Sequence, residues 1–153
     1  MDKQRLILVV LTVLPLAAAC GTGTTGSGSV GAEKPVTGVR WSVDSVTVDG
    51  KTHQAPEGAN VELKDGKAAG NYGCNHFNAK VTTAEDGTIR LSHVTTTRMA
   101  CEKPVMTFEQ TLADTLVGGA LKTAVTDDHL TLTTASGDTV RLTESTEAAE
   151  STH

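Results

Sequence analysis

The chain has few aromatic residues and few cations. Only 3% of its 153 residues are aromatic, and 13 Lys and Arg are outnumbered by 18 Asp and Glu, which gives a net charge of −5. Nucleic-acid binding requires the opposite sign of charge and usually rings that stack on bases. We therefore expect no nucleic-acid partner, and we expect anionic lipid headgroups to repel the folded part of the chain.

Long hydrophobic runs are also missing. The main apolar run, Leu6–Leu16, is too short to cross a hydrocarbon core of about 30 Å as a helix. Lys3 and Arg5 precede this run and small residues follow it, which is the layout of a secretory signal peptide. We assign residues 1–19 to that signal peptide.

Cys20 follows three alanines and changes the type of signal that we expect. The sequence "LAAAC" resembles a lipobox, where cleavage is followed by diacylation of the cysteine, although Ala17 stands where Leu is usual. Two acyl chains anchor a protein stably, because each buried CH2 contributes about 0.8 kcal/mol. We predict an extracytoplasmic protein attached to the cell membrane by acylated Cys20, so that membrane lipid is a partner. Ordinary secretion by cleavage after Ala19 is the alternative.

Polar segments flank the predicted domain. Residues 20–37 are rich in Gly, Thr and Ser and, after the lipidated cysteine, form a flexible linker. Residues 144–153 are acidic and lack an apolar face, which predicts a disordered tail. Residues 38–143 are left as one domain of common size without internal repeats.

Apolar and polar residues alternate in several short runs of the domain, which predicts β-strands. In "RWSVDSVTV" the phase of the alternation changes, and this indicates a bulge at Asp44-Ser45. In the last predicted hairpin, Leu130 and Leu132 are expected to face Val140 and Leu142. Glycine-containing turns are expected to separate the strands, at Gly50, Gly66, Gly87 and Gly137.

One segment has a helical period instead. Pro104 suits the start of a helix and Gly118 suits its end. The apolar residues between them form a single stripe: Val105, Phe108, Leu112 and Leu116. Such a stripe must pack on the inner face of the strands. We predict an α+β fold, in which a curved antiparallel β-sheet (a barrel-like meander) packs against one α-helix.

Two cysteines, Cys74 and Cys101, are present in the domain. An even pair in an exported domain is typical of a disulfide. The closed loop would hold about 28 residues, for which the chain-entropy model gives about 3.5 kcal/mol of stabilisation.

A metal site is the alternative for these cysteines. A tetrahedral zinc site takes four ligands, and two cysteines with two histidines could supply them. The thioethers of Met99 and Met106 would instead suit Cu(I). The four zinc ligands would be Cys74, His76, His93 and Cys101. Their spacing departs from common zinc patterns, so we favour the disulfide and assign no metal and no cofactor.

No catalytic constellation is apparent, and we predict that the protein is not an enzyme. A cysteine nucleophile would need an oriented base, and His76 lacks a third partner. Glu109 and Asp114 are five residues apart on the helix and point to different faces, and Glu109 is explained by the positive helix N-terminus. Gly73 is expected to allow close approach of the Cys74 loop to its partner segment. A small apolar ligand in the mouth of the curved sheet is a further alternative.

Several spaced motifs resemble the META domain of the HslJ-like heat-shock lipoprotein family. The family pattern falls on Gly73, Cys74, Asn75 and Phe77, then on Thr97, Met99, Ala100 and Cys101, then on Met106 and Glu109, and finally on Leu130 and Leu132. The resemblance covers residues 38–143, with Ala79 where family members often have Gly.

The resemblance implies a small, often lipid-anchored domain of the bacterial cell envelope, linked to heat stress and antibiotic tolerance. It implies no catalytic residue. The resulting hypothesis is a monomeric, non-enzymatic stress-response module, structural or interacting, with an unidentified envelope protein as its partner.

Overall fold

The computed structural model describes residues 35–146. The predicted signal peptide, Cys20, most of the linker and the end of the acidic tail lie outside the described residues. The described part folds into strands and one helix, in the order β1 (Arg40–Val48), β2 (Lys51–Gln54), β3 (Asn60–Lys64), β4 (Lys67–Asn71), β5 (His76–Thr83), β6 (Ile89–Thr96), α2 (Lys103–Val117), β7 (Leu121–Thr126), β8 (His129–Thr134) and β9 (Thr139–Glu144). The last strand extends one residue beyond the predicted domain.

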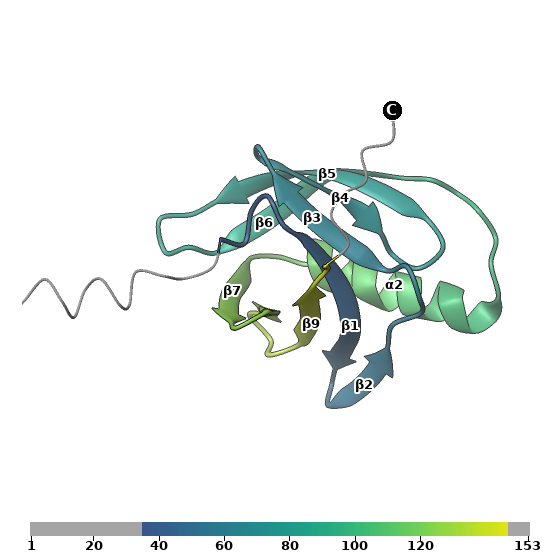
Figure 1. The fold of residues 1–153 in the computed structure, drawn as a ribbon. Helices are drawn as coiled ribbons and strands as arrows, with labels where there is room; N and C mark the ends of the chain where they lie inside the picture. Colours follow the sequence, from purple (N-terminus) through teal and green to yellow (C-terminus); the bar gives the residue numbers. More distant parts are fainter. Residues whose placement is uncertain (1–34, 147–153) are drawn as a thin grey trace, which may run out of the picture. The chain divides into compact units, whose positions relative to one another are not determined.

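The predicted curved antiparallel sheet is confirmed, and it closes into a barrel. Strands β1 and β3 to β9 pair in sequence order, and an additional pairing of β1 with β9 completes the ring. In Figure 1, β3 to β6 form one side of the barrel, and β7 to β9 with β1 form the other. Strand β2 lies outside the ring as a hairpin extension of β1. A single pair, Ile89 with Leu121, joins β6 to β7, so the ring is weakest at this seam.

The bulge predicted in β1 is present. The register with β9 shifts between Val43 and Ser45. On the edge of β1 opposite to β9, residues 40–42 before the shift pair with β3. Residues 45–48 after the shift pair with β2 on that same edge. A bulge bends a strand and increases its twist, which lets one strand serve both the barrel and the hairpin.

The glycine-containing turns are also present. At Asp49-Gly50 and Asp65-Gly66 both residues have positive φ, with values of 49° and 76° and of 52° and 71°. This is the backbone of a type I′ turn, which matches the right-handed twist of the flanking strands.

A second bulge, between β5 and β6, was not predicted. The register shifts between Asn78 and Lys80, and His93 opposite has a φ of 52°. A residue with a side chain rarely adopts this left-handed conformation. The only sign of this bulge in the sequence is the change of apolar phase from Leu91 to the half-buried Val94, on either side of the exposed His93.

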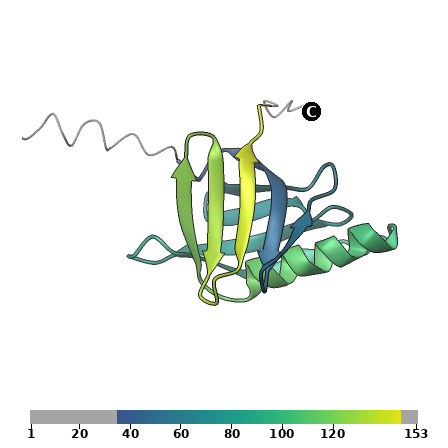
Figure 2. The same ribbon diagram turned by 90° about the horizontal axis from the view of Figure 1, so that it is seen from below.

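The helix presents the predicted stripe to the core. Phe108, Leu112 and Leu116 are buried, and α2 contacts β6, β1 and β9. Figure 2 shows α2 running beside the ends of β1 and β9. The predicted facing pairs of the last hairpin, Leu130 with Leu142 and Leu132 with Val140, are confirmed. The helix therefore covers one end of a barrel whose interior is filled by side chains.

Two strands were not predicted from the sequence. Strand β2 has the sequence KTHQ with no apolar residue, and β7 has LKTAVT with a single fully buried side chain, Leu121. Their pairing with β1 and β8 is a property of the assembled sheet. Within residues 35–146 no helix is both long and apolar enough to span a membrane.

Candidate functional site

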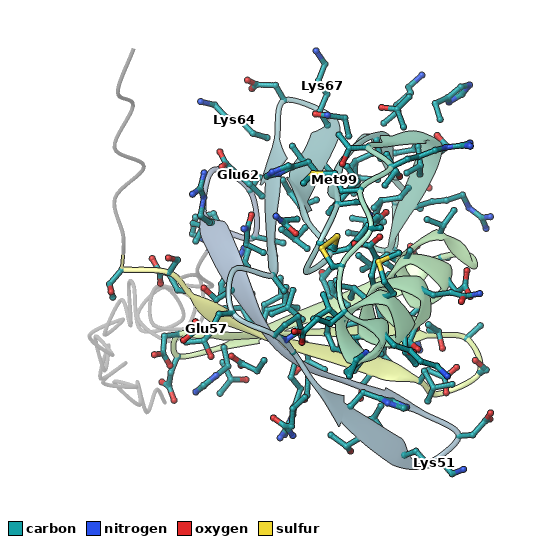
Figure 3. The ribbon with its side chains drawn as sticks, turned by 90° about the vertical axis from the view of Figure 1, so that its right-hand side faces the viewer. Lys51, Glu57, Glu62, Lys64, Lys67 and Met99 are labelled. Carbon is teal, nitrogen blue, oxygen red and sulfur yellow. A yellow bond between two sulfur atoms is a disulfide. The ribbon has the colours of Figure 1, made fainter. Side chains whose placement is uncertain are left out.

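The structure contains the predicted disulfide between Cys74 and Cys101, with an S–S distance of 2.01 Å and a Cα–Cα distance of 6.0 Å. Cys74 lies in the β4–β5 loop (residues 72–75), and Cys101 lies in the β6–α2 segment (residues 97–102). The disulfide therefore joins the β4–β5 loop covalently to the β6–α2 segment, just before α2 begins. It is drawn as a yellow bond in Figure 3.

The same two connections are held together by Asn75, which is buried. Its Nδ2 group donates to Glu109 Oε1 at 2.6 Å and to the Met99 carbonyl oxygen at 3.2 Å. Its Oδ1 atom accepts from the Met99 N–H at 2.6 Å and from the Thr97 hydroxyl at 3.0 Å. A primary amide offers two N–H donors and two lone pairs. All four are used, so this side chain is saturated.

Glu109 adds the helix to this cluster. Its Oε2 atom accepts from the backbone N–H of Asn75 at 2.6 Å and of Cys74 at 3.1 Å. The side chain is only 8% exposed, and within residues 35–146 no cation forms an ion pair with it. Hydrogen bonds from three N–H groups thus offset the cost of burying the carboxylate.

The explanation predicted for Glu109 was wrong. The residue lies in the second turn of α2, and the first turn contains no acidic residue. The carboxylate therefore acts through its bonds to the β4–β5 loop and not through the helix N-terminus. Asp114 is exposed, so the prediction that the two carboxylates point to different faces is confirmed.

Gly73 is required by its surroundings, but its neighbour differs from the predicted one. Its φ is 131°, and a Cβ atom there would lie 2.8 Å from Pro56 Cγ and 3.5 Å from Val105 Cγ1. The close approach is to the β2–β3 connection and to α2, and not to the Cys101 segment. The Gly73 N–H donates to Asn71 Oδ1 at 2.7 Å.

The four residues of the alternative metal site are not brought together to bind a metal. The sulfur atoms of Cys74 and Cys101 are bonded to each other, so neither supplies a thiolate to a metal or to a substrate. His76 and His93 are exposed on β5 and β6. Within residues 35–146, no group of three or more His, Cys, Asp and Glu side chains is arranged to hold a metal ion.

Met99 is the most exposed large hydrophobic side chain in the described part, at 59%. Its backbone N–H and carbonyl are both bonded to Asn75, and Cys101 two residues later is tied by the disulfide. The side chain, labelled in Figure 3, is therefore held on a rigid segment although it contacts little itself.

Tyr72, which the sequence did not single out, lies behind the cluster. Its ring stacks on Phe77 with centroids 4.2 Å apart and an interplanar angle of 9°. Burial, and with it the negative charge of Glu109, raises the pKa of Tyr72 to about 12. Its position beside Gly73 and Cys74 was the only signal in the sequence, and a loop position does not reveal burial.

Comparisons with known proteins show a family and a fold. A family model described as META domain matches residues 34–147. A protein from Burkholderia xenovorans, solved by NMR, is 23% identical over 72% of this chain and 84% of its own, with a TM-score of 0.61. A further NMR structure is 20% identical over 67% of this chain and 86% of its own, with a TM-score of 0.51. At these identities the likeness to the two structures shows the fold alone. No curated protein matches the chain.

Replacing Glu109 with Gln tests the cluster. Gln has one carbonyl oxygen in place of two carboxylate oxygens, so an amide N–H group must face at least one of the donors. We expect the free energy of unfolding, measured in urea, to fall by about 2–3 kcal/mol. The control Asp114→Asn removes an exposed carboxylate from the same helix. It should change the free energy of unfolding by less than about 0.5 kcal/mol. Equal effects would contradict the role of Glu109.

A second prediction concerns the ionisation of Tyr72, the chain's only tyrosine. Phenolate absorbance should give a midpoint near pH 12 in the folded protein and near pH 10 in urea. Because the folded pKa is higher, the contribution to stability is complete below pH 10 and is lost between pH 10 and 12, by about 2–3 kcal/mol. In the Tyr72→Phe variant, the free energy of unfolding should not show this additional fall between pH 10 and 12. A folded-state midpoint near 10 would show that the phenol is not buried.

Proposed function

Since the chain belongs to the META domain family, we propose that it is a lipid-anchored protein of the bacterial cell envelope. In this proposal acylated Cys20 attaches it to the extracytoplasmic face of the membrane. The domain then serves as a non-enzymatic structural and interaction module in a stress response, with an unidentified envelope protein as its partner.

The observation that carries the location is the Cys74–Cys101 disulfide. Disulfides persist in oxidising compartments and are rare in the cytosol. The signal-like residues 1–19 and the cysteine that follows them support export and anchoring. Removal of Lys3, Arg5 and Asp2 with the leader leaves 11 Lys and Arg against 17 Asp and Glu, a net charge of −6. Such a domain would stand off an anionic membrane surface on its linker.

The hydrogen bonds of the motif residues support a structural role. The Asn75 side chain is saturated, and both oxygens of Glu109 accept N–H groups of the β4–β5 loop. A general base must be able to reach a substrate proton, and these two groups are occupied. Neither the family description nor the two similar structures name an activity.

Met99 supports the interaction role. An exposed apolar side chain on a rigid segment contributes to binding at a low cost in conformational entropy, because the backbone is already ordered. The Asn75 bonds to the Met99 backbone provide that order. We therefore place the partner's contact at the β6–α2 segment.

Site-specific photo-crosslinking tests the partner contact. A benzophenone amino acid replaces Met99 in the full chain, expressed with its own leader in bacteria. The matched control carries it at Val117, the other exposed large hydrophobic residue of the described part, 41% exposed against 59% for Met99. We expect illumination to give a discrete crosslinked protein from the Met99 position only. Equal products from both positions, or none from either, would contradict the contact.

The anchor is tested by the intact mass of the mature protein and by its fractionation. We expect the mass of a chain that begins at a diacylated Cys20 and that lacks two hydrogens relative to the reduced form. Cys20→Ser should leave the protein unacylated and move it from the membrane fraction to the soluble fraction. A wild-type chain that begins at an unmodified Cys20 would show ordinary secretion instead.

A further inference from the structure

Strand β7 has one open edge. It pairs with β8 along its whole length, but it shares with β6 only the pair of Leu121 with Ile89. Within the part of the chain that the structure describes, no strand pairs with residues 122–126 on that side. Figure 2 shows β7 as the outermost strand of the row formed by β1, β9, β8 and β7.

The backbone groups of Thr123 and Val125 point to this open edge. The Asp128 carbonyl and the Thr134 N–H both bond to the β9 side, and successive residues of a strand direct their backbone groups to alternate sides. The odd-numbered residues of β8 therefore bond to β7, where their partners are the even-numbered residues. Thr123 and Val125 are left with an N–H and a carbonyl each that bond to no other described residue.

Little in the sequence of β7 protects this edge. Native proteins protect open edges with very short strands, charges or proline. Strand β2, which also has a single neighbour, is four residues long and has no apolar residue. Strand β7 has six residues, which include Leu, Ala and Val, and Lys122 is its single charge. Its edge is therefore a template on which a further strand can pair.

The spacing of the free groups fits a second β7 strand. If two copies lie antiparallel with Ala124 opposite Ala124, Thr123 of each copy faces Val125 of the other. The two symmetric pairs then exchange two hydrogen bonds each, and every free group of both residues is used. A shift in one direction would require Leu121, which already pairs with Ile89. A shift in the other would require Asp127, whose φ of 56° is not that of a strand.

The charges agree with the same register. Lys122 would face Thr126 of the second copy, beside the Asp127-Asp128 turn that follows β7. The two-fold symmetry repeats this arrangement at the other end of the paired strands. Opposite charges on neighbouring strands stabilise a sheet, and like charges directly opposite each other destabilise it. No like charges face each other here.

We propose that the open edge of β7 binds a second copy of this chain, with the two β7 strands antiparallel about Ala124. So short an edge buries much less than the about 1,600 Å² of a standard interface, so the association is weak. Copies held on one membrane by flexible linkers reach effective concentrations of about 1 mM, at which weak pairing is populated. This dimer replaces the monomer expected from the sequence. It goes beyond the proposed function, which concerns an unlike partner at Met99.

Disulfide trapping tests the register in the exported full chain carrying Cys20→Ser. Ala124→Cys places two thiols directly opposite each other, at the Cβ separation of a non-hydrogen-bonded pair, which a disulfide can bridge. We expect a covalent dimer of twice the chain mass. Thr126→Cys is the matched control, because it lies on the same strand and is also exposed. Its two thiols would be about 13 Å apart, since they are offset by four residues. A mixture of Thr126→Cys and Lys122→Cys chains should form the mixed dimer.

Sedimentation velocity tests the association without a crosslink. For the Cys20→Ser chain we expect the sedimentation coefficient to rise with concentration up to about 1 mM. Val125→Pro removes an N–H that points away from β8, so the strand keeps its pairing with β8, and this variant should stay monomeric.

Three outcomes would overturn the proposal. The first is a Cys20→Ser chain that stays monomeric at about 1 mM. The second is an equal yield of covalent dimer from Ala124→Cys and Thr126→Cys. The third is a mixed disulfide of Ala124→Cys with another envelope protein in place of the dimer, which would assign the edge to that protein. Because the chain tested is not acylated, none of these results depends on the membrane anchor.

Discussion

The buried carboxylate of Glu109 is the constraint on which the rest of the site depends. It accepts three N–H groups from Cys74 and Asn75, and no ion pair accompanies it within the described residues. A buried charge is tolerated only when hydrogen bonds replace its hydration. The β4–β5 loop therefore has to take the one conformation that points its N–H groups at α2. The disulfide restrains the same place covalently, so the loop, the β6–α2 segment and the helix act as one unit.

This unit gives one exposed and one buried side chain a fixed position. On one side, Asn75 fixes the Met99 backbone and leaves its side chain exposed. The same loop conformation buries Tyr72 against Phe77, and the Tyr72 hydroxyl has no hydrogen-bond partner among the described residues. Both depend on the ordered backbone of these two connections, which the Asn75 side chain and the disulfide hold together. The polar groups of this unit therefore stabilise its shape.

Where burial follows a simple period, the fold could be read from the sequence. The stripe of α2, the facing pairs of β8 and β9 and the bulge of β1 each appear as a phase in the apolar pattern, and each is present. Strands β2 and β7 carry little apolar pattern, and backbone pairing with β1 and β8 places them in the sheet. His93 adopts its left-handed backbone at the bulge between β5 and β6, which the sequence marks only by the single apolar residue Val94 out of phase with Leu91.

The sequence by itself determined an antiparallel sheet with a helix and a pair of cysteines suited to a disulfide, and it predicts an export signal with a cysteine after it. These depend on local composition and on periods of two and 3.6 residues, which are visible along the chain. Only the tertiary structure decided the closure of the barrel through β1 and β9, the bond of Glu109 to a loop more than thirty residues away, and the burial of Tyr72. Those features depend on which distant groups meet after folding, and the chemical identity of a residue does not specify its partner.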